Sequence, residues 1–204
     1  EVILSTSPER FLKVFQGHAS SRPIKGTAPK GAHHSEQAVL SEQLRTCPKQ
    51  RAENTMIVDL VRNDLSKVCR ADSVRVTQYC AVEVFAHVLH LVSEVTGQLK
   101  ADQTALSAFS ALFPAGSITG APKIQAMKWI QQLELQPRGA YCGALGYMSF
   151  TGALDSNVLI RTVIQRSETL MAHAGGAVVL ASDPKAEYAE CLLKAQRLVK
   201  GYHV

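Results

Sequence analysis

The sequence lacks several features that would assign a protein to a class at once. It has no apolar run near the roughly 20 residues that span a bilayer, and no stretch with the basic and apolar regions of a signal peptide. Aromatic residues make up only 6% of the chain, and the basic residues form no block, although 22 Lys and Arg against 17 Asp and Glu give a net charge of +5. Nucleic-acid-binding surfaces usually need such blocks. The sequence therefore predicts a protein that binds neither a membrane nor a nucleic acid.

The cysteines also lack a pattern that would give them a role. No two of the five form a CxxC pair, the spacing of many zinc and redox motifs; they are Cys47, Cys69, Cys80, Cys142 and Cys191. An odd, scattered set is typical of reduced thiols. We therefore expect a cytoplasmic protein.

The composition is that of a folded domain. Of the 204 residues, 46% are hydrophobic and 19% are charged, a balance that disordered chains do not have. This length can bury a sizeable core in one domain over residues 1–204. A strand-like run, Val2-Ile3-Leu4, stands at the very start with no initiator Met. We therefore expect the domain to lack its N-terminal portion.

Hydrophobic spacing predicts alternating blocks of strands and helices. Strands are expected in a hairpin over 1–16, as a pair within 73–99, and at 140–150, 157–166 and 169–180. Helices are expected at 36–44, 49–67, 103–112, 121–134 and from Asp183-Pro184 to Gly201, with a loop over 17–35. Short turns between neighbouring strands favour antiparallel pairing. The predicted class is α+β, with antiparallel sheets packed against helices.

Arg161 is the most unusual residue of the chain. It interrupts Val158-Leu159-Ile160 and Thr162-Val163-Ile164, which are apolar on both faces of the expected strand. A buried charge needs a partner, because leaving it bare costs several kcal/mol. Either an internal ion pair or the carboxylate of a substrate would serve, and the sequence does not decide between them.

The last predicted helix carries acidic residues on one face. Glu187, Glu190 and Lys194 are spaced i, i+3 and i+7. A solvated face with a Glu–Lys pair is the commoner explanation of this spacing. The alternative is a site for a hard cation such as Mg²⁺, which would need a further carboxylate, for which Glu53 is a candidate.

Two shorter features have a structural and a functional interpretation. Lys25 lies among apolar and small residues, where it is either an exposed loop lysine or a desolvated nucleophile. The loop 116–120 leads into a helix and is either a capped turn or an anion cradle.

Taken together, the motifs resemble the chorismate-utilising enzymes, which include the large subunits of anthranilate synthase and aminodeoxychorismate synthase and the isochorismate and salicylate synthases. They follow the family's order along essentially the whole chain. The matching segments are Ser7-Pro8-Glu9-Arg10-Phe11, Pro23-Ile24-Lys25-Gly26-Thr27, 53–64, 90–93, Gly116-Ser117-Ile118-Thr119-Gly120-Ala121-Pro122-Lys123, 141–143, 160–162, 174–176 and 187–194. The resemblance implies part of the family's chorismate-binding β-sandwich.

The resemblance also implies roles for the acidic residues. Glu53 and Glu190 correspond to carboxylates that hold Mg²⁺, with Glu187 assisting through water, and the metal binds the ring carboxylate of chorismate. Glu9 corresponds to a carboxyl group at the ring C4 hydroxyl, where a protonated carboxyl acts as general acid.

For the remaining positions, the resemblance implies contacts with the substrate. Arg161 and Tyr141 correspond to residues that bind the enolpyruvyl carboxylate, and Lys194 and the backbone near Gly175 to further carboxylate contacts. A second set lies around the ring: Ser117 and Thr119 in the pocket loop, and His90 beside the ring.

Lys25 separates the subfamilies, because a Lys at this place is similar to the aminodeoxychorismate synthase component. The implied reaction is attack of the Lys25 amine at ring C2 with loss of the C4 hydroxyl, followed by addition of ammonia at C4. The alternatives are an anthranilate synthase large subunit, which aminates C2 and eliminates pyruvate, and a truncated, non-catalytic binding fragment. The sequence has no glutaminase Cys–His–Glu arrangement, so a glutamine amidotransferase subunit is the implied source of ammonia.

Overall fold

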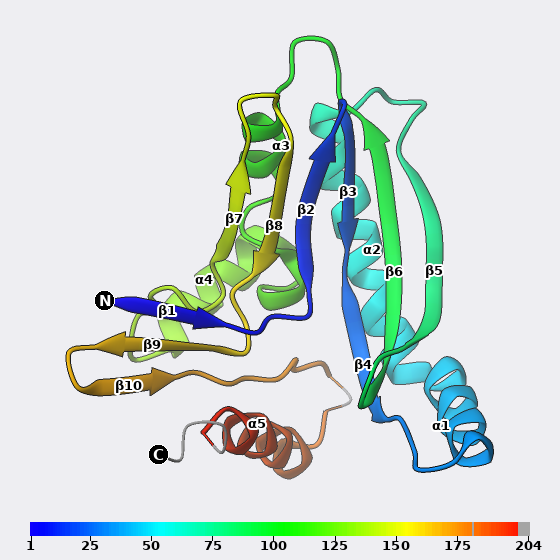
Figure 1. The fold of residues 1–204 in the computed structure, drawn as a ribbon, viewed down its shortest axis with the longest axis vertical. Helices are drawn as coiled ribbons and strands as arrows, with labels where there is room; N and C mark the ends of the chain where they lie inside the picture. The colour runs from blue at the N-terminus through cyan, green and yellow to red at the C-terminus, as the bar shows by residue number, and fades with distance from the viewer. Residues whose placement is uncertain (181, 200–204) are drawn as a thin grey trace.

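The structure is a computed structural model that describes residues 1–180 and 182–199. It contains two antiparallel sheets and helices that pack against them (Figure 1), so the predicted α+β class is confirmed. Among the helices in this part of the chain, none combines the length and the apolar character that crossing a bilayer requires.

The larger sheet holds most of the strands. Its order is β4-β6-β3-β2-β8-β7, with β5 paired to β6; the strands are β2 Arg10–Phe15, β3 His18–Arg22, β4 Ile24–Pro29, β5 Arg75–Val84, β6 Val88–Gln98, β7 Ala144–Met148 and β8 Leu154–Val158. Strands β3 and β4 follow each other along the long strand β6, separated by Pro23, whose carbonyl accepts from the Ser93 N–H at 3.2 Å. The backbone ladder thus continues across the proline.

Helix α2 (Pro48–Val68) lies across one face of this sheet (Figure 1). It begins at Pro48, which has no N–H to leave unpaired at the first helical position. Its buried stripe, spaced at helical intervals, includes Ile57, Val61 and Leu65 and packs with strand residues such as Leu12 in one core. Helix α3 (Ala105–Leu112) joins the same core, and α1 (His34–Thr46) packs beside β4 and β5.

The smaller sheet has the order β1-β9-β10, with β1 Val2–Ser5, β9 Thr162–Arg166 and β10 Thr169–Ala172. Helix α5 (Pro184–Val199) lies below it in Figure 1. Asp183 caps α5, because its Oδ1 accepts from the Ala186 N–H at 2.8 Å. The predicted start of this helix is confirmed, and its predicted end at Gly201 lies outside the described residues.

Two sequence predictions near the N-terminus are wrong. Residues 1–16 form no hairpin, since β1 pairs with β9 while β2 pairs with β3 and β8. Residues 17–35 are not a loop, because they contain β3, β4 and the start of α1. The Ser- and His-rich composition resembled a loop, but in β3 small residues such as Ala19 and Ser21 are the ones that alternate into the buried face.

The predicted strand 157–166 is also wrong. The chain leaves the large sheet after Val158 and enters the small sheet at Thr162, so Arg161 lies in the connection and not inside a strand. The run is apolar on both sides because its two halves are buried in different sheets. Of the neighbouring predictions, 140–150 is shortened to β7, and 169–180 contains only β10.

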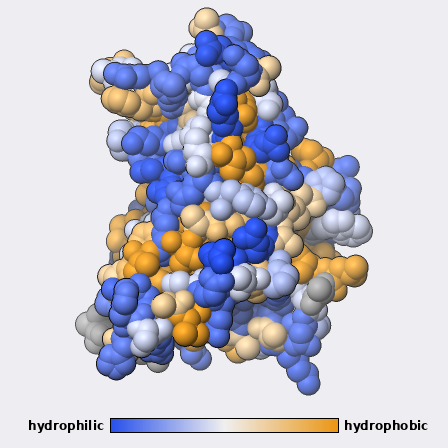
Figure 2. All heavy atoms as spheres, turned by 90° about the vertical axis from the view of Figure 1, so that its right-hand side faces the viewer, coloured by the Kyte–Doolittle hydropathy of each residue, from blue (hydrophilic) through white to orange (hydrophobic). Residues whose placement is uncertain are grey.

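The surface shows the mixed character that the composition indicates. Figure 2 views the side of β5 and α1, where apolar side chains emerge between polar ones. Exposed apolar residues there include Val39, Val76 and Val84. Single exposed apolar residues are normal on a folded protein.

A buried ion pair joins α2 to α4 (Lys123–Leu133). Lys123 Nζ lies 2.5 Å from Asp64 Oδ2 and 2.7 Å from the carbonyl of Leu112 at the end of α3. The other oxygen of Asp64 binds Lys67 at 2.7 Å, and the Lys67 side chain is 56% exposed against 12% for Lys123. Lys123 therefore fixes both ends of the connection that runs from α3 to α4.

Replacing Lys123 with Met should lower the free energy of unfolding by about 3 kcal/mol, since it leaves a buried carboxylate with one exposed partner. The matched control is Lys67→Met, which removes the exposed partner of the same carboxylate and should change stability by about 0–1 kcal/mol. Urea unfolding followed by circular dichroism measures both. Equal losses in the two variants would contradict the assignment of Lys123 as the main partner.

Candidate active site

Three segments far apart in the sequence meet around Lys25 on β4. Its Nζ donates to the carbonyl of Ser117 at 3.0 Å, and Ser117 lies in the short 3₁₀ helix η1 (Gly116–Ile118) between α3 and α4. Glu9, in the crossing from the small sheet to the large one, lies close enough for the charge of Lys25 to act on it. The structure thus brings together a lysine and a carboxyl group that the sequence only suggested.

Glu9 is almost fully buried, with 6% of its surface exposed. Burial raises the pKa of its carboxyl group from 4.5 to about 7, although the Ser117 side chain, the Lys25 charge and the Ile24 backbone each lower it. The Ser117 hydroxyl is buried and makes no other hydrogen bond of ordinary geometry within the described residues. A carboxyl with this pKa can hold a proton at neutral pH and deliver it, as a general acid must.

His90 lies on β6 next to β4. Its Nδ1 is 3.0 Å from the hydroxyl of Thr27, and the ring of Phe85 stands edge-on to it at 5.2 Å. Burial lowers the pKa of the imidazole, and the charge of Arg161 lowers it further, whereas a hydrogen bond with the Gly26 backbone raises it. His90 is therefore mainly neutral, with its orientation set by Thr27. The sequence analysis gave Thr27 no role of its own. The only signal was its position in the matching segment, two residues after Lys25.

Arg161 reaches α5 from the connection between β8 and β9. Its Nη1 donates to the carbonyl of Lys194 at 3.3 Å, and its own backbone has a φ of 51°. This left-handed conformation is uncommon for a residue other than Gly and occurs often at functional sites. It turns the chain between the sheets and brings the guanidinium group near His90 and α5.

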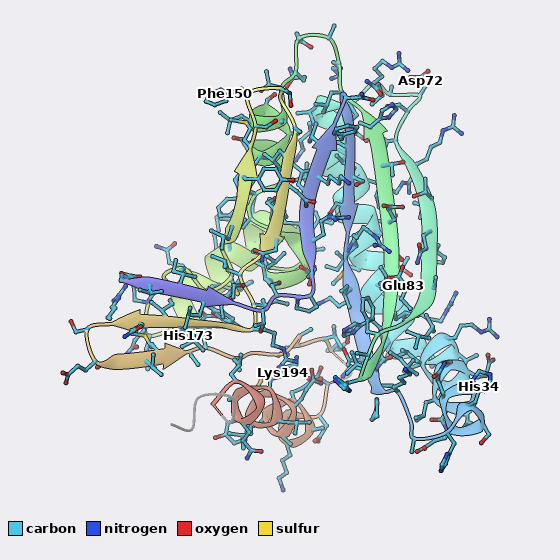
Figure 3. The ribbon with its side chains drawn as sticks, in the orientation of Figure 1. His34, Asp72, Glu83, Phe150, His173 and Lys194 are labelled. Atoms are coloured by element: carbon cyan, nitrogen blue, oxygen red, sulfur yellow. The ribbon has the colours of Figure 1, made fainter. Side chains whose placement is uncertain are left out.

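Lys194 links α5 to the segment after β10. Its Nζ donates to the carbonyl of Gly175 at 3.0 Å and pairs with Glu190 Oε1 at 2.5 Å. In Figure 3 it rises from α5 toward this segment, in which His173 is also labelled. The structure thus brings Arg161, Lys194 and Gly175 together.

Tyr141 approaches the same segment from the other side. Its hydroxyl oxygen would lie 3.0 Å from a Cβ at Gly175, so a side chain at that position would crowd the phenol. Burial and the neighbouring Cys142 raise the pKa of Tyr141 well above its usual value, which keeps the hydroxyl protonated as a hydrogen-bond donor. Tyr141 and Gly175 therefore face each other.

Thr119, another predicted site residue, makes its side-chain hydrogen bond within its own loop. Its hydroxyl donates to the carbonyl of Ala115 at 2.9 Å, within the loop that carries Ser117. It also lines an apolar cavity of about 480 Å³ together with Tyr141. A second cavity, of about 410 Å³, includes Glu9 in its wall, and Lys25 lines neither of the two.

The three acidic residues predicted to bind a metal all act on one lysine, Lys49. Lys49 Nζ lies 2.6 Å from Glu187 Oε1, which also accepts from Ser182 Oγ at 2.7 Å, and these bonds lower the pKa of Glu187. The pKa of Lys49 is raised in turn, by the hydrogen bond to Glu187 and by the charges of Glu53 and Glu190. The sequence signal missed here was the i, i+4 spacing of Lys49 and Glu53 on α2.

These carboxylate oxygens are the kind of donor that Mg²⁺ prefers. They already attract a positive charge, the ammonium group of Lys49. Within the described residues, however, no three His, Cys, Asp or Glu side chains lie close enough to hold a metal ion by themselves. Mg²⁺ usually takes one or two carboxylates and completes its shell with water and ligand oxygens. The arrangement therefore suits an ion that shares its ligands with a substrate.

The chain has close relatives among characterised protein families. A family model described as chorismate binding enzyme matches residues 1–200. The chain is 50% identical over 195 residues to an aminodeoxychorismate synthase of Streptomyces pristinaespiralis, with 95% of this chain and 27% of the relative covered. It is 45% identical over 197 residues to an anthranilate synthase component 1 of Mycolicibacterium smegmatis, with 97% and 38% covered.

Solved structures of chorismate-utilising enzymes have a similar fold. The crystal structure of anthranilate synthase component I from Streptococcus pneumoniae matches with a TM-score of 0.87 and 39% identity. The match covers 96% of this chain and 43% of that one. The chain thus spans less than half the length of each of these three proteins.

The buried carboxyl of Glu9 makes stability depend on pH. The folded state keeps the proton up to about pH 7, whereas the unfolded state releases it near 4.5, so stability falls as pH rises through this window. The loss should total about 3 kcal/mol, and Glu9→Gln should remove it. Urea unfolding at several pH values between 4.5 and 8 measures this difference.

The matched control is Glu168→Gln, which alters an exposed carboxylate in the turn between β9 and β10. This variant should keep the pH dependence of the unaltered chain. A Glu9→Gln variant with the same pH dependence as the unaltered chain would show that the Glu9 pKa is not raised.

Proposed function

This chain belongs to the family of chorismate-binding enzymes, and we propose that it is the catalytic part of an aminodeoxychorismate synthase. The proposed reaction replaces the C4 hydroxyl of chorismate with an amino group, giving 4-amino-4-deoxychorismate and water. The observation that carries this proposal is the position of Lys25, hydrogen-bonded to the Ser117 carbonyl and next to the buried carboxyl of Glu9, whose pKa is raised to about 7.

Binding of a dicarboxylate such as chorismate would use the cations around α5. In the proposed complex, Arg161 and Tyr141 bind the enolpyruvyl carboxylate, and Lys194 and the backbone near Gly175 add further contacts. The closeness of these four groups supports this assignment, since a planar guanidinium and a phenol donor can bind one carboxylate together.

The first proposed chemical step joins Lys25 to the substrate. Lys25 first passes a proton to the carboxylate of Glu9. Its amine then attacks C2, the ring double bond shifts, and the C4–oxygen bond breaks. Hydroxide is a poor leaving group, so Glu9 gives its proton to the departing oxygen and water leaves. The Ser117 carbonyl orients the amine by accepting one of its N–H groups.

In the second proposed step the enzyme is restored. Ammonia attacks C4, the double bond shifts back, and the C2–nitrogen bond to Lys25 breaks. The proton lost by the ammonia nitrogen returns to the Lys25–Glu9 pair. The amine thus ends on C4, whereas direct attack of ammonia on C2 would give the ortho product.

Mg²⁺ is part of the proposal. Glu53 and Glu190 would hold it, with Glu187 assisting, and the bound ion would neutralise the ring carboxylate of chorismate. This support comes from the oxygen-only donor set around Lys49. We include a glutamine amidotransferase subunit as the source of ammonia, a cytoplasmic location, and a later lyase that forms 4-aminobenzoate for folate biosynthesis.

A second candidate is an anthranilate synthase large subunit, which aminates C2 and eliminates pyruvate. The 45% identity to a component 1 of that enzyme favours it, together with the structural match to another. Under this alternative Lys25 has no covalent role. A binding fragment without activity is a third possibility, because the chain spans only part of its relatives.

Replacing Lys25 with Ala should reduce formation of 4-amino-4-deoxychorismate by at least about 100-fold, since it removes the nucleophile. The assay contains chorismate, Mg²⁺ and ammonium, and chromatography identifies the product. The matched control is Lys13→Ala, which alters an exposed lysine on strand β2 of the same sheet and should leave the rate unchanged.

The product decides between the candidates. Anthranilate from the unaltered chain would favour the second one, and full 4-amino product from Lys25→Ala would exclude the covalent step. Calorimetric titration with chorismate and Mg²⁺ tests the third candidate, the fragment without activity. Such a fragment would bind chorismate without turnover or would not bind it at all.

A further inference from the structure

Lys49 lies where a metal ion would be expected. Its ammonium group contacts Glu187 Oε1 at 2.6 Å and acts on Glu53 and Glu190 through their charges. We propose that Lys49 is an internal counter-ion of these three carboxylates, and that Mg²⁺ must displace it in order to bind. This inference rests on the proposed function, because it takes the carboxylates to be the metal site.

The first argument is the geometry at Glu187. This side chain is only 11% exposed, and its Oε1 already accepts from both Lys49 and Ser182. An oxygen that accepts two such bonds has little room for a cation. A metal ion near Glu187 would therefore compete directly with the ammonium group.

The second argument is the balance of charge. All three carboxylates act on Lys49. Lys194 pairs with Glu190 and acts on Glu187, so the five groups together carry one negative charge in excess. An Mg²⁺ ion in place of Lys49 would make the group neutral, whereas Mg²⁺ beside both lysines would leave it positive. Like charges at such short range repel strongly when they are partly shielded from water.

The third argument is that Lys49 can leave. It lies in the first turn of α2, and its side chain is 45% exposed. A lysine with a long flexible stem can move its ammonium group into water without burying a bare charge. The displaced group would therefore have a place to go.

The exchange has a consequence for the fold. The Lys49–Glu187 pair connects α2 with α5, the two helices that carry the carboxylates. A cation bound by Glu53 and Glu190 would connect the same two helices. Lys49 would thus hold the acidic residues together until the ion arrives, and it would weaken the binding of that ion.

The test is a calorimetric titration of Mg²⁺ into the whole chain, with and without chorismate. Lys49→Gln should tighten Mg²⁺ binding by about tenfold, because one competing positive charge is removed at a partly exposed site. Lys49→Arg keeps the charge and should bind Mg²⁺ within about twofold of the unaltered chain. The matched control is Lys185→Gln, which removes an exposed charge from α5 and should also have little effect.

The outcomes separate this inference from the proposed function. Equal or weaker Mg²⁺ binding by Lys49→Gln, with normal binding by the unaltered chain, would overturn the role of Lys49 alone. An equal tightening of Mg²⁺ binding in Lys185→Gln would also overturn the role of Lys49, because the effect would then come from the net charge of the chain and not from the position of Lys49. No Mg²⁺ binding by any variant, even with chorismate, would overturn both the metal site and the role of Lys49.

Discussion

The arrangement of this molecule depends on a double crossing between its two sheets. One chain segment leaves β1 for β2, and another leaves β8 for β9, and the two are bonded to each other. The N–H of Thr6 donates to the Arg161 carbonyl at 3.1 Å, and the N–H of Val158 donates to the Glu9 carbonyl at 3.0 Å. Backbone groups that leave a sheet must find partners elsewhere, and here each crossing satisfies the other. The result places an acid and a cation, Glu9 and Arg161, at the junction of the sheets.

Two groups at this junction lower the stability of the folded state. Glu9 is buried at the expense of its charge, and Arg161 takes a backbone conformation that few residues adopt. These features persist because the core of α2, α3 and the large sheet fixes the surrounding elements. Lys123 adds to this, since it joins Asp64 on α2 to the end of α3. Rigid parts on all sides therefore allow Lys25 and Glu9 to stay close together.

Local patterns allowed much of the fold to be predicted. The spacing of Ile57 and Val61 predicted α2, and Asp183-Pro184 predicted the start of α5, because helix periodicity and caps are local signals. The predictions failed where burial depends on distant segments. Residues 17–35 resembled a loop, since small side chains of β3 such as Ala19 and Ser21 are buried only against partners elsewhere in the chain. The run 157–166 resembled one strand, since its two halves are apolar for separate reasons.

The sequence by itself determined the motifs, their order and the family, because these depend only on which residues follow one another. It also singled out Lys25, Glu9 and Arg161 as residues with chemical potential. Only the tertiary structure decided which of them meet. It placed Lys25 against the Ser117 carbonyl, raised the pKa of Glu9 by burial, and set Lys49 among three carboxylates. Proximity and desolvation arise between segments far apart in the chain, so no local pattern encodes them.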